Sequence, residues 1–221
     1  MEIDEKIRIT FNTLSILHYV KSDVPPSLMD SIRKDLHNIK KDNFKEAKEY
    51  NNYLVGNIEK EFLYKDGPIR LNNFLNVISK EYWKKSIFST SNSNRDMQIR
   101  VNEDSLPDIW VNYMKAGEIN APHNHGGVLS FVIWVDIPYF IEEEYKNPSV
   151  SKSKSKVAGN FSFIFPKIDI PGGLHYSNLP IDNNDEGQMI LFPSTLNHAA
   201  YPFYTSNEYR VSIAGNLDFI K

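Results

Sequence analysis

A series of short apolar segments in the second half of this 221-residue chain constrains its fold more than any other feature. Each segment is rich in β-branched and aromatic residues and is bounded by Pro, Gly or Asn; they cover residues 110–114, 128–136, 160–165, 188–192 and 209–215. Segments of this length and composition are typical of β-strands. Several such strands at short spacing predict a β-sandwich or barrel.

The first 95 residues combine strand-like and helix-like patterns. Residues 6–20 alternate apolar and polar positions and predict one or two strands, whereas Pro25 and Pro26 begin a helical pattern with apolar residues at 28, 32, 36 and 39. A second helical pattern predicts a helix over about 69–86. We therefore expect a mainly β fold with N-terminal helices, in which a support region, 1–95, packs on a β core, 96–221, as one compact domain.

Composition excludes several classes of function. Lys and Arg number 25 and Asp and Glu number 28, so the net charge of −3 gives no basic field for nucleic acid. No apolar run reaches the roughly 18 residues that cross a bilayer, so no membrane partner is expected. The absence of cysteine excludes thiolate metal sites, disulfides and cysteine nucleophiles, and the start of the chain lacks signal-peptide features, which favours the cytoplasm.

Three of the six histidines have a spacing that suits metal binding. His123 and His125 precede the segment 128–136, and His198 follows the segment 188–192. Residues i and i+2 of an extended chain face the same side, so two imidazoles can meet at one point, and a third from a distant strand can join them. Such a site suits iron, zinc, copper or nickel. Histidine pairs also occur at positions that bind no metal. The spacing alone therefore does not exclude that these histidines are merely exposed or structural.

A second pattern lies in the last apolar segment, where Arg210 and Ser212 share one face of the expected strand. An arginine that points into an apolar interior requires an anion. A carboxylate ligand fits, because guanidinium binds it through two parallel hydrogen bonds and a serine hydroxyl can donate a third. The alternative is an outward Arg210 that pairs with Glu208 or with solvent.

The order of these features resembles that of the iron(II)- and 2-oxoglutarate-dependent oxygenases. Over residues 107–217, the His-x-His pair, the glycine-containing strand, the segment 187–198 and the Arg-x-Ser pair are similar in particular to prolyl-hydroxylase-like oxygenases of large phages and marine bacteria. The resemblance implies a double-stranded β-helix, also called a jelly roll, with Fe(II) at one mouth. It also implies that 2-oxoglutarate and O2 are converted to succinate and CO2 while an unknown substrate, by analogy a protein or peptide, is hydroxylated.

The resemblance also implies roles for individual residues. His123 and His198 match the two metal histidines, and Arg210 with Ser212 matches the pair that holds the distal carboxylate of 2-oxoglutarate. Tyr113, ten residues before His123, matches a co-substrate-binding tyrosine. Asn112 is its competitor for that role, and a packing role for Tyr113 is the alternative.

One position departs from the family pattern, because His125 stands where an Asp or Glu is usual. A neutral imidazole there leaves the ferrous site one charge unit more positive. We expect His125 to be the third ligand, with Asp136 or a water as alternatives; Asp136 lies at the far end of the strand. Two other functions stay open: a non-enzymatic jelly-roll binding or structural protein with a vestigial metal site, and a cupin-like iron enzyme that does not use 2-oxoglutarate.

Overall fold

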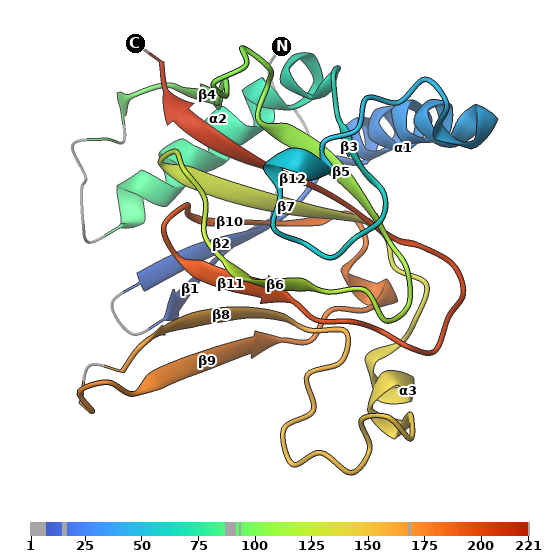
Figure 1. Cartoon of the computed structure of the whole chain (residues 1–221). Coiled ribbons are helices and arrows are strands. Elements are labelled where there is room, and N and C mark those ends of the chain that lie inside the picture. The colour runs from blue at the N-terminus through green and yellow to red at the C-terminus, as the bar shows by residue number, and fades with distance from the viewer. Residues whose placement is uncertain (1–7, 15–16, 87–91, 93, 168, 221) are drawn as a thin grey trace.

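Two antiparallel sheets, facing each other as layers, form the body of the molecule (Figure 1). The structure, a computed structural model, describes residues 8–14, 17–86, 92, 94–167 and 169–220. The mainly β fold with N-terminal helices is confirmed. Among the described residues, no helix combines the length and apolarity needed to cross a bilayer.

Within the described residues, the larger sheet has eight strands. In spatial order they are β1 (Ile9–Leu14), β2 (Leu17–Asp23), β10 (Gln188–Pro193), β7 (Leu129–Asp136), β12 (Arg210–Phe219), β5 (Ile109–Met114) and β3 (Glu61–Leu63), and β4 (Met97–Ile99) pairs with the end of β12. Strands from the first 95 residues and from the C-terminal half therefore share one sheet. The boundary between the two regions at residue 95 stays a prediction.

The smaller sheet, in the part of the chain that the structure describes, has four strands, in the order β6 (Asn120–His123), β11 (Asn197–Ala200), β8 (Phe161–Pro166) and β9 (Leu174–Leu179). Only β8 coincides with one of the apolar segments that predicted strands. The other three are short or carry few apolar residues, and β9 is largely exposed. Their backbones are held by pairing with β8 or β11 rather than by apolar residues of their own.

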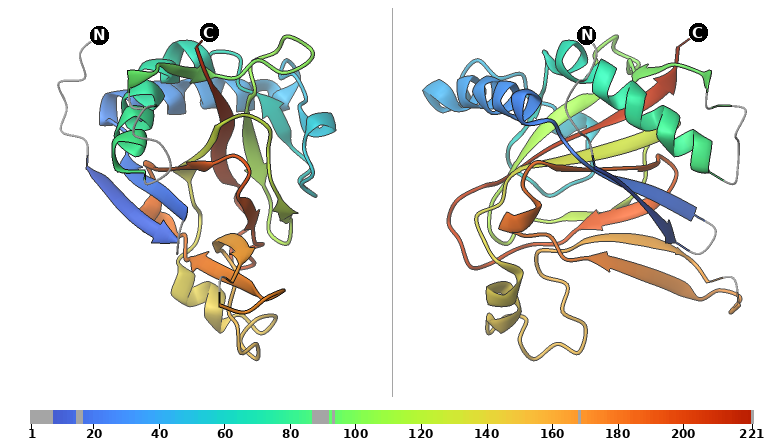
Figure 2. Two further views of the ribbon diagram at one scale, coloured as in Figure 1. Left: turned by 90° about the vertical axis from the view of Figure 1, so that its left-hand side faces the viewer. Right: turned by 180° about the vertical axis from the view of Figure 1, so that it is seen from behind.

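Two helices, α1 (Pro26–Lys40) and α2 (Gly67–Lys85), cover the outer face of the larger sheet (Figure 2), and both sequence-based helices are confirmed. A short helix, α3 (Ile141–Lys146), lies near the smaller sheet. The described residues also contain the short helical turns η1 (Lys41–Phe44), η2 (Asn51–Tyr53) and η4 (Asn183–Asp185). The apolar faces of α1 and α2 supply Ile32, Leu71 and Leu75, each fully buried, to a core beneath them.

Strand alternation divides the interior into two cores. On β12, Val211 and Ile213 face the helices, whereas Ala214 faces the smaller sheet. The core between the sheets is strongly aromatic; it includes Trp110, Trp134, Phe161, Phe163 and Phe192. Polar side chains that point inward from β5 and β12 therefore enter an apolar, water-poor space. That space contains the candidate site.

Candidate metal centre and adjoining cavity

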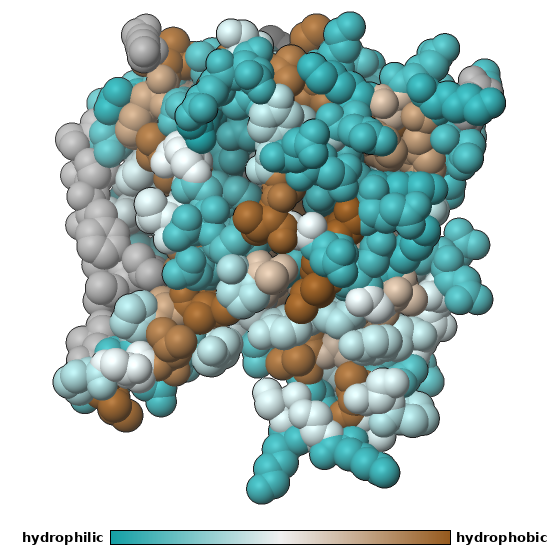
Figure 3. All heavy atoms as spheres, viewed as in Figure 1, coloured by the Kyte–Doolittle hydropathy of each residue, from teal (hydrophilic) through white to brown (hydrophobic). Residues whose placement is uncertain are grey.

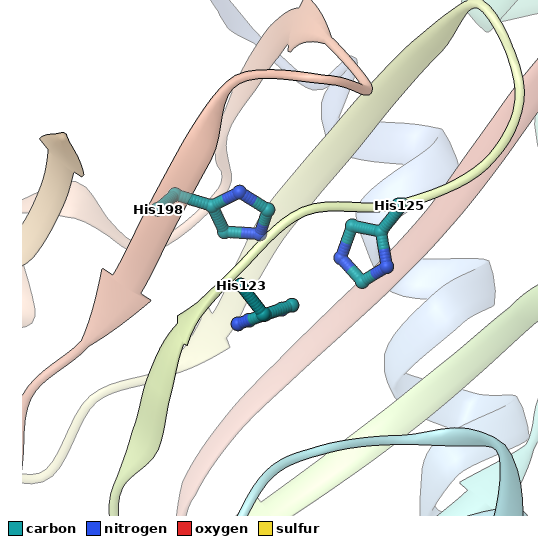
Figure 4. Close-up of side chains that lie close together, drawn as sticks. All are labelled: His123, His125 and His198. Carbon is teal, nitrogen blue, oxygen red and sulfur yellow. The ribbon is translucent and has the colours of Figure 1, made fainter. Parts of the chain in front are cut away.

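His123, His125 and His198 converge on one point between the sheets (Figure 4). One nitrogen of each ring can be chosen so that all three lie within 4.8 Å of one another. The ring centroids of His123 and His198 are 4.4 Å apart, and His125 lies 4.7 Å and 5.1 Å from them. The structure thus brings together the three histidines that the sequence singled out.

Strand pairing explains this convergence. His123 ends β6 and lies opposite His198 in the register of β6 with β11. His125 follows in the turn to β7, where its backbone N–H donates to the carbonyl of Ser194 at 2.9 Å. Ser194 belongs to the connection that leads to His198, so one backbone hydrogen bond joins the two loops that carry the site.

Burial keeps the three imidazoles neutral. It lowers the pKa of His125 to about 3, with a smaller contribution from the charge of His123, and it lowers the pKa of His123 and His198 as well. A neutral imidazole is the form that ligates a metal. The cluster is therefore ready to bind a cation at neutral pH without first releasing protons.

Two of the rings are also oriented by their own backbone. The Nδ1–H of His123 donates to the carbonyl of Ala121 at 2.6 Å, and the Nδ1–H of His198 donates to that of Leu196 at 2.9 Å. These bonds fix the tautomer and leave Nε2 as the free ligand atom, the arrangement usual in metal sites. The donor set fits a transition metal such as iron.

Asp136, the alternative third ligand, lies outside this cluster. It is exposed at the end of β7, and its carboxylate is 3.9 Å from the guanidinium of Arg33. In the part of the chain that the structure describes, no carboxylate joins the three histidines. Three neutral imidazoles would therefore offset none of the charge of a divalent cation bound there.

A cavity adjoins the histidines, and all three of them form part of its wall. Arg210 lines it and is 5% exposed, so the outward alternative for Arg210 is wrong. Its guanidinium donates to the Tyr139 hydroxyl at 2.9 Å and to the Tyr201 carbonyl at 3.1 Å, which are neutral groups. Within the described ranges no carboxylate forms an ion pair with it, so the cavity contains an uncompensated positive charge.

Ser212 and Asn112 stand beside Arg210 on the same cavity wall. They are direct partners across β12 and β5, and the Asn112 side-chain amide donates to the Ser212 hydroxyl at 3.3 Å. The carbonyl oxygen of the Asn112 side chain is buried and has no hydrogen-bond partner in the described structure. Orphaned polar atoms of this kind mark a place where a ligand or water completes the bonding.

Tyr113 does not reach the cavity, so the expectation that it contacts the co-substrate is wrong. Its side chain lies on the helix side of β5, where the hydroxyl donates to the Leu36 carbonyl at 3.1 Å and the ring packs on Phe44. Burial there raises its pKa. The reason is strand alternation: Asn112 and Tyr113 are adjacent in β5, so only one of them can point inward.

The structure also places residues at the cavity that the sequence did not single out for the site. Tyr139 holds Arg210, and Trp110 lies with its ring centroid 5.5 Å from that of His125. Trp110 is 2% exposed, and its indole N–H has no acceptor among the described residues. Both residues have apolar neighbours in the sequence, so the sequence pattern predicts only a core role for them.

Comparisons with known proteins agree with this geometry. Residues 108–216, which hold all the cavity residues discussed above, match the family described as "Putative 2OG-Fe(II) oxygenase". No curated protein sequence matches the chain.

Among solved structures, a prolyl-4-hydroxylase of Pseudomonas putida is similar with a TM-score of 0.51 and 11% identity, covering 92% of each chain. A prolyl hydroxylase of Trichoplax adhaerens, in complex with a hypoxia inducible factor peptide fragment, has a TM-score of 0.47 and 12% identity, covering 97% of this chain and 83% of the other. The first similarity confirms the jelly-roll fold. The phage and marine-bacterial type stays a prediction.

Proposed function

We propose that this chain hydroxylates an organic substrate, because residues 108–216 match the 2OG-Fe(II) oxygenase family. Family members use Fe(II) and 2-oxoglutarate. The chemistry that these groups supply when bound is the oxidation of a substrate C–H bond by O2, coupled to the conversion of 2-oxoglutarate to succinate and CO2. The residues of this chain bind and orient the reactants and exclude water.

In our proposal, His123, His125 and His198 hold the iron. The support for this is the neutral, pre-oriented imidazole cluster, whose ligand nitrogens already lie within 4.8 Å of one another. Pre-orientation lowers the ordering cost of binding. The aromatic side chains of Trp110, Phe161 and Phe192 line the same cavity and keep bulk water from it.

Arg210 carries the co-substrate assignment. A buried guanidinium without a carboxylate partner, in the same cavity as the histidines, requires an anion, and 2-oxoglutarate presents one at each end. Ser212 and Asn112 add polar groups beside it. Trp110, next to His125, and Met114, opposite Arg210, are four residues apart on β5, roughly 13 Å of strand. Both Met114 and Trp110 line the cavity, so a diacid held by Arg210 would lie along this stretch of β5 toward the histidines.

The test is succinate release from 2-oxoglutarate by the purified 221-residue chain loaded with Fe(II). We expect slow turnover without added substrate, dependent on both iron and 2-oxoglutarate. Iron binding without 2-oxoglutarate binding would instead favour the cupin-like enzyme. Failure to bind either would favour the non-enzymatic jelly-roll protein with a vestigial site.

A further inference from the structure

A row of polar side chains crosses three strands of the larger sheet beside the co-substrate cavity. Glu61 on β3 lies directly opposite Asn112 on β5, and Asn112 lies directly opposite Ser212 on β12. Residues that are directly opposite point to the same face of a sheet. The neighbours of Glu61 agree, because Phe62 packs beneath the helices and Leu63 packs between the sheets. Glu61 therefore points toward the smaller sheet, as do Asn112 and Ser212, which line the cavity.

The carboxyl group of Glu61 lies in an unusual environment. Hydrophilic residues predominate on the upper part of the face drawn in Figure 3, whereas Glu61 is 0% exposed. The equally buried carboxylate of Glu144 accepts from the backbone N–H groups of Tyr204 and Thr205, each at 2.8 Å. Among the described residues, Oε1 of Glu61 has no hydrogen-bond partner, and Oε2 accepts a long bond of 3.4 Å from Asn51. Glu61 thus lacks the donors that stabilise a buried anion.

The charges around Glu61 also oppose its ionisation. Glu118, in the turn between β5 and β6, places a negative charge near it, and both carboxylate oxygens of Glu118 accept backbone N–H bonds. Glu59 and Lys115 form an ion pair with each other, which lowers the pKa of Glu59 and raises that of Lys115. Burial and the charge of Glu118 raise the pKa of Glu61 to about 8. Near neutral pH, Glu61 is a carboxylic acid with a proton to donate.

This proton completes a chain of hydrogen bonds along the row. The side-chain N–H of Asn112 donates to the Ser212 hydroxyl at 3.3 Å, and the carbonyl oxygen of the same amide is buried without a donor. The acid O–H of Glu61, across the strand pair, supplies a donor from within the chain. Because Ser212 accepts from Asn112, its own O–H stays free to donate to a carboxylate held by Arg210.

Asn120 offers a second buried acceptor near Glu61. A Cβ at Gly56 would lie 3.3 Å from Oε1 of Glu61 and 3.2 Å from Oδ1 of Asn120, so the backbone of Gly56 covers both oxygens. The Oδ1 atom of Asn120 also lacks a hydrogen-bond partner in the described structure. Strand register favours Asn112, which lies directly opposite Glu61, whereas Asn120 belongs to β6 of the facing sheet.

We propose that Glu61 is a positioning residue for the co-substrate, because its carboxylic acid orients the amide of Asn112. Glu61 donates to the Asn112 carbonyl, Asn112 donates to Ser212, and Ser212 donates to a carboxylate of 2-oxoglutarate. Loss of the proton reverses this chain: an ionised Glu61 accepts from the Asn112 N–H, and the Asn112 carbonyl then takes up the Ser212 hydroxyl. The new negative charge also repels a dicarboxylate. This inference rests on the proposed function, which it deepens by naming a residue that controls co-substrate affinity.

The first experiment is calorimetry of 2-oxoglutarate binding across pH, with Fe(II) under anaerobic conditions. Below its pKa of about 8 Glu61 keeps the proton and the chain is intact; above it the proton is lost. We expect the affinity to fall at least about threefold between about pH 7 and about pH 9, since one hydrogen bond to a neutral group contributes about three- to tenfold. A parent affinity that stays constant over this interval would overturn the proposal.

Other groups that face this region do not titrate in the same interval. Burial lowers the pKa of each of the three cavity histidines, so they are already neutral. Arg210 keeps its proton throughout. The ammonium of Lys60 lies on the helix side, where it donates to the Tyr209 hydroxyl at 2.9 Å. The carboxylates of 2-oxoglutarate, with ordinary pKa values of about 4, stay charged.

Two substitutions separate positioning from packing. Glu61→Gln keeps an N–H donor at every pH, so it should bind 2-oxoglutarate like the parent near pH 7 and lose the fall at higher pH. Glu61→Leu has no donor and should bind about three- to tenfold more weakly already near pH 7. The matched control is Glu49→Gln, an exposed position that bridges to Phe62 beside Glu61, and it should behave like the parent. The same pH dependence in Glu61→Gln and the parent contradicts the proposal.

Double-mutant cycles identify the acceptor. The losses of affinity from Glu61→Leu and Asn112→Ala should not add, because both break one chain of hydrogen bonds. The losses from Glu61→Leu and Asn120→Ala should add. Additive losses in the first pair, or coupling in the second pair alone, would contradict the proposal. Failure of the parent chain to bind 2-oxoglutarate would contradict the proposed function instead.

Discussion

His123 and His198 lie directly opposite each other in the antiparallel register of β6 and β11, with their ring centroids 4.4 Å apart. Each ring is oriented in the same way, by an Nδ1–H that donates to the carbonyl two residues earlier in the chain. A shift of one residue in this register would turn one ring to the opposite face of the sheet. The register of two short strands thus decides whether the metal centre exists.

Substitution of His125 tests whether this residue binds the metal, because iron affinity changes only if it does. If His125 binds iron, His125→Ala removes a donor and should lower iron affinity strongly, whereas His125→Asp supplies a carboxylate and should retain much of the metal. Iron titration of the folded variants measures this. His37→Ala, on the exposed face of α1, is the control. Iron affinity in His125→Ala equal to that of the parent would remove His125 from the ligand set.

Replacement of Arg210 should weaken the binding of 2-oxoglutarate and leave the binding of iron unchanged. We expect Arg210→Ala to lower 2-oxoglutarate affinity about ten- to a hundredfold, because a charge-assisted hydrogen bond contributes about 1.5–3 kcal/mol. Calorimetry measures the affinity, and iron binding should survive. Arg210→Lys, which keeps the charge but loses the two-pronged geometry, should give an intermediate loss. Parental affinity in both variants would contradict the assignment.

Glu61 should make the stability of the fold depend on pH. It is fully buried on β3, and burial together with the charge of Glu118 raises its pKa from 4.5 to about 8. Between these values the unfolded chain releases the proton that the folded chain keeps. The free energy of unfolding therefore falls as pH rises, by up to about 1.4 kcal/mol per unit from this group.

Glu61→Gln removes this titration. Relative to the parent, the variant should gain stability as pH rises from about 4.5 to about 8 and show no further relative change above that. Urea unfolding at a series of pH values measures the difference, with the exposed Glu46→Gln as control. Parallel stability curves for Glu61→Gln and the parent would show that Glu61 is not protonated in the folded state.

A buried chain of hydrogen bonds should support the loops of the metal centre. The Ser194 hydroxyl is 3.0 Å from that of Ser130, which donates to Asn216 at 2.6 Å; Asn216 in turn donates to Asp108 at 2.8 Å. We expect Ser130→Ala to lower the free energy of unfolding by about 1–3 kcal/mol, because it leaves buried partners unsatisfied. It should also weaken iron binding, since Ser194 holds the backbone of His125.

Chemical denaturation and iron titration of the same Ser130→Ala protein measure the two effects. The exposed Ser153→Ala variant controls for loss of a hydroxyl as such. Reduced stability with parental iron affinity would show that the chain supports the fold but not the metal centre.

The sequence by itself determined the parts of this protein that depend on local patterns. The helix α1 follows from apolar residues spaced by three and four behind a proline pair, and strands such as β7 and β12 follow from their β-branched and aromatic runs. The His-x-His and Arg-x-Ser spacings also indicated which side chains share a face, since alternation along a strand needs no knowledge of its neighbours.

Tertiary structure decided which face of each strand meets which core. The resemblance pointed to Tyr113, with Asn112 as its competitor, whereas the packing of Tyr113 under α1 turns Asn112 into the cavity. The strand β11 has almost no apolar pattern and exists because β6 and β8 pair with it. Such pairings join residues far apart in the chain, and their energies arise from contacts that no local window of sequence contains.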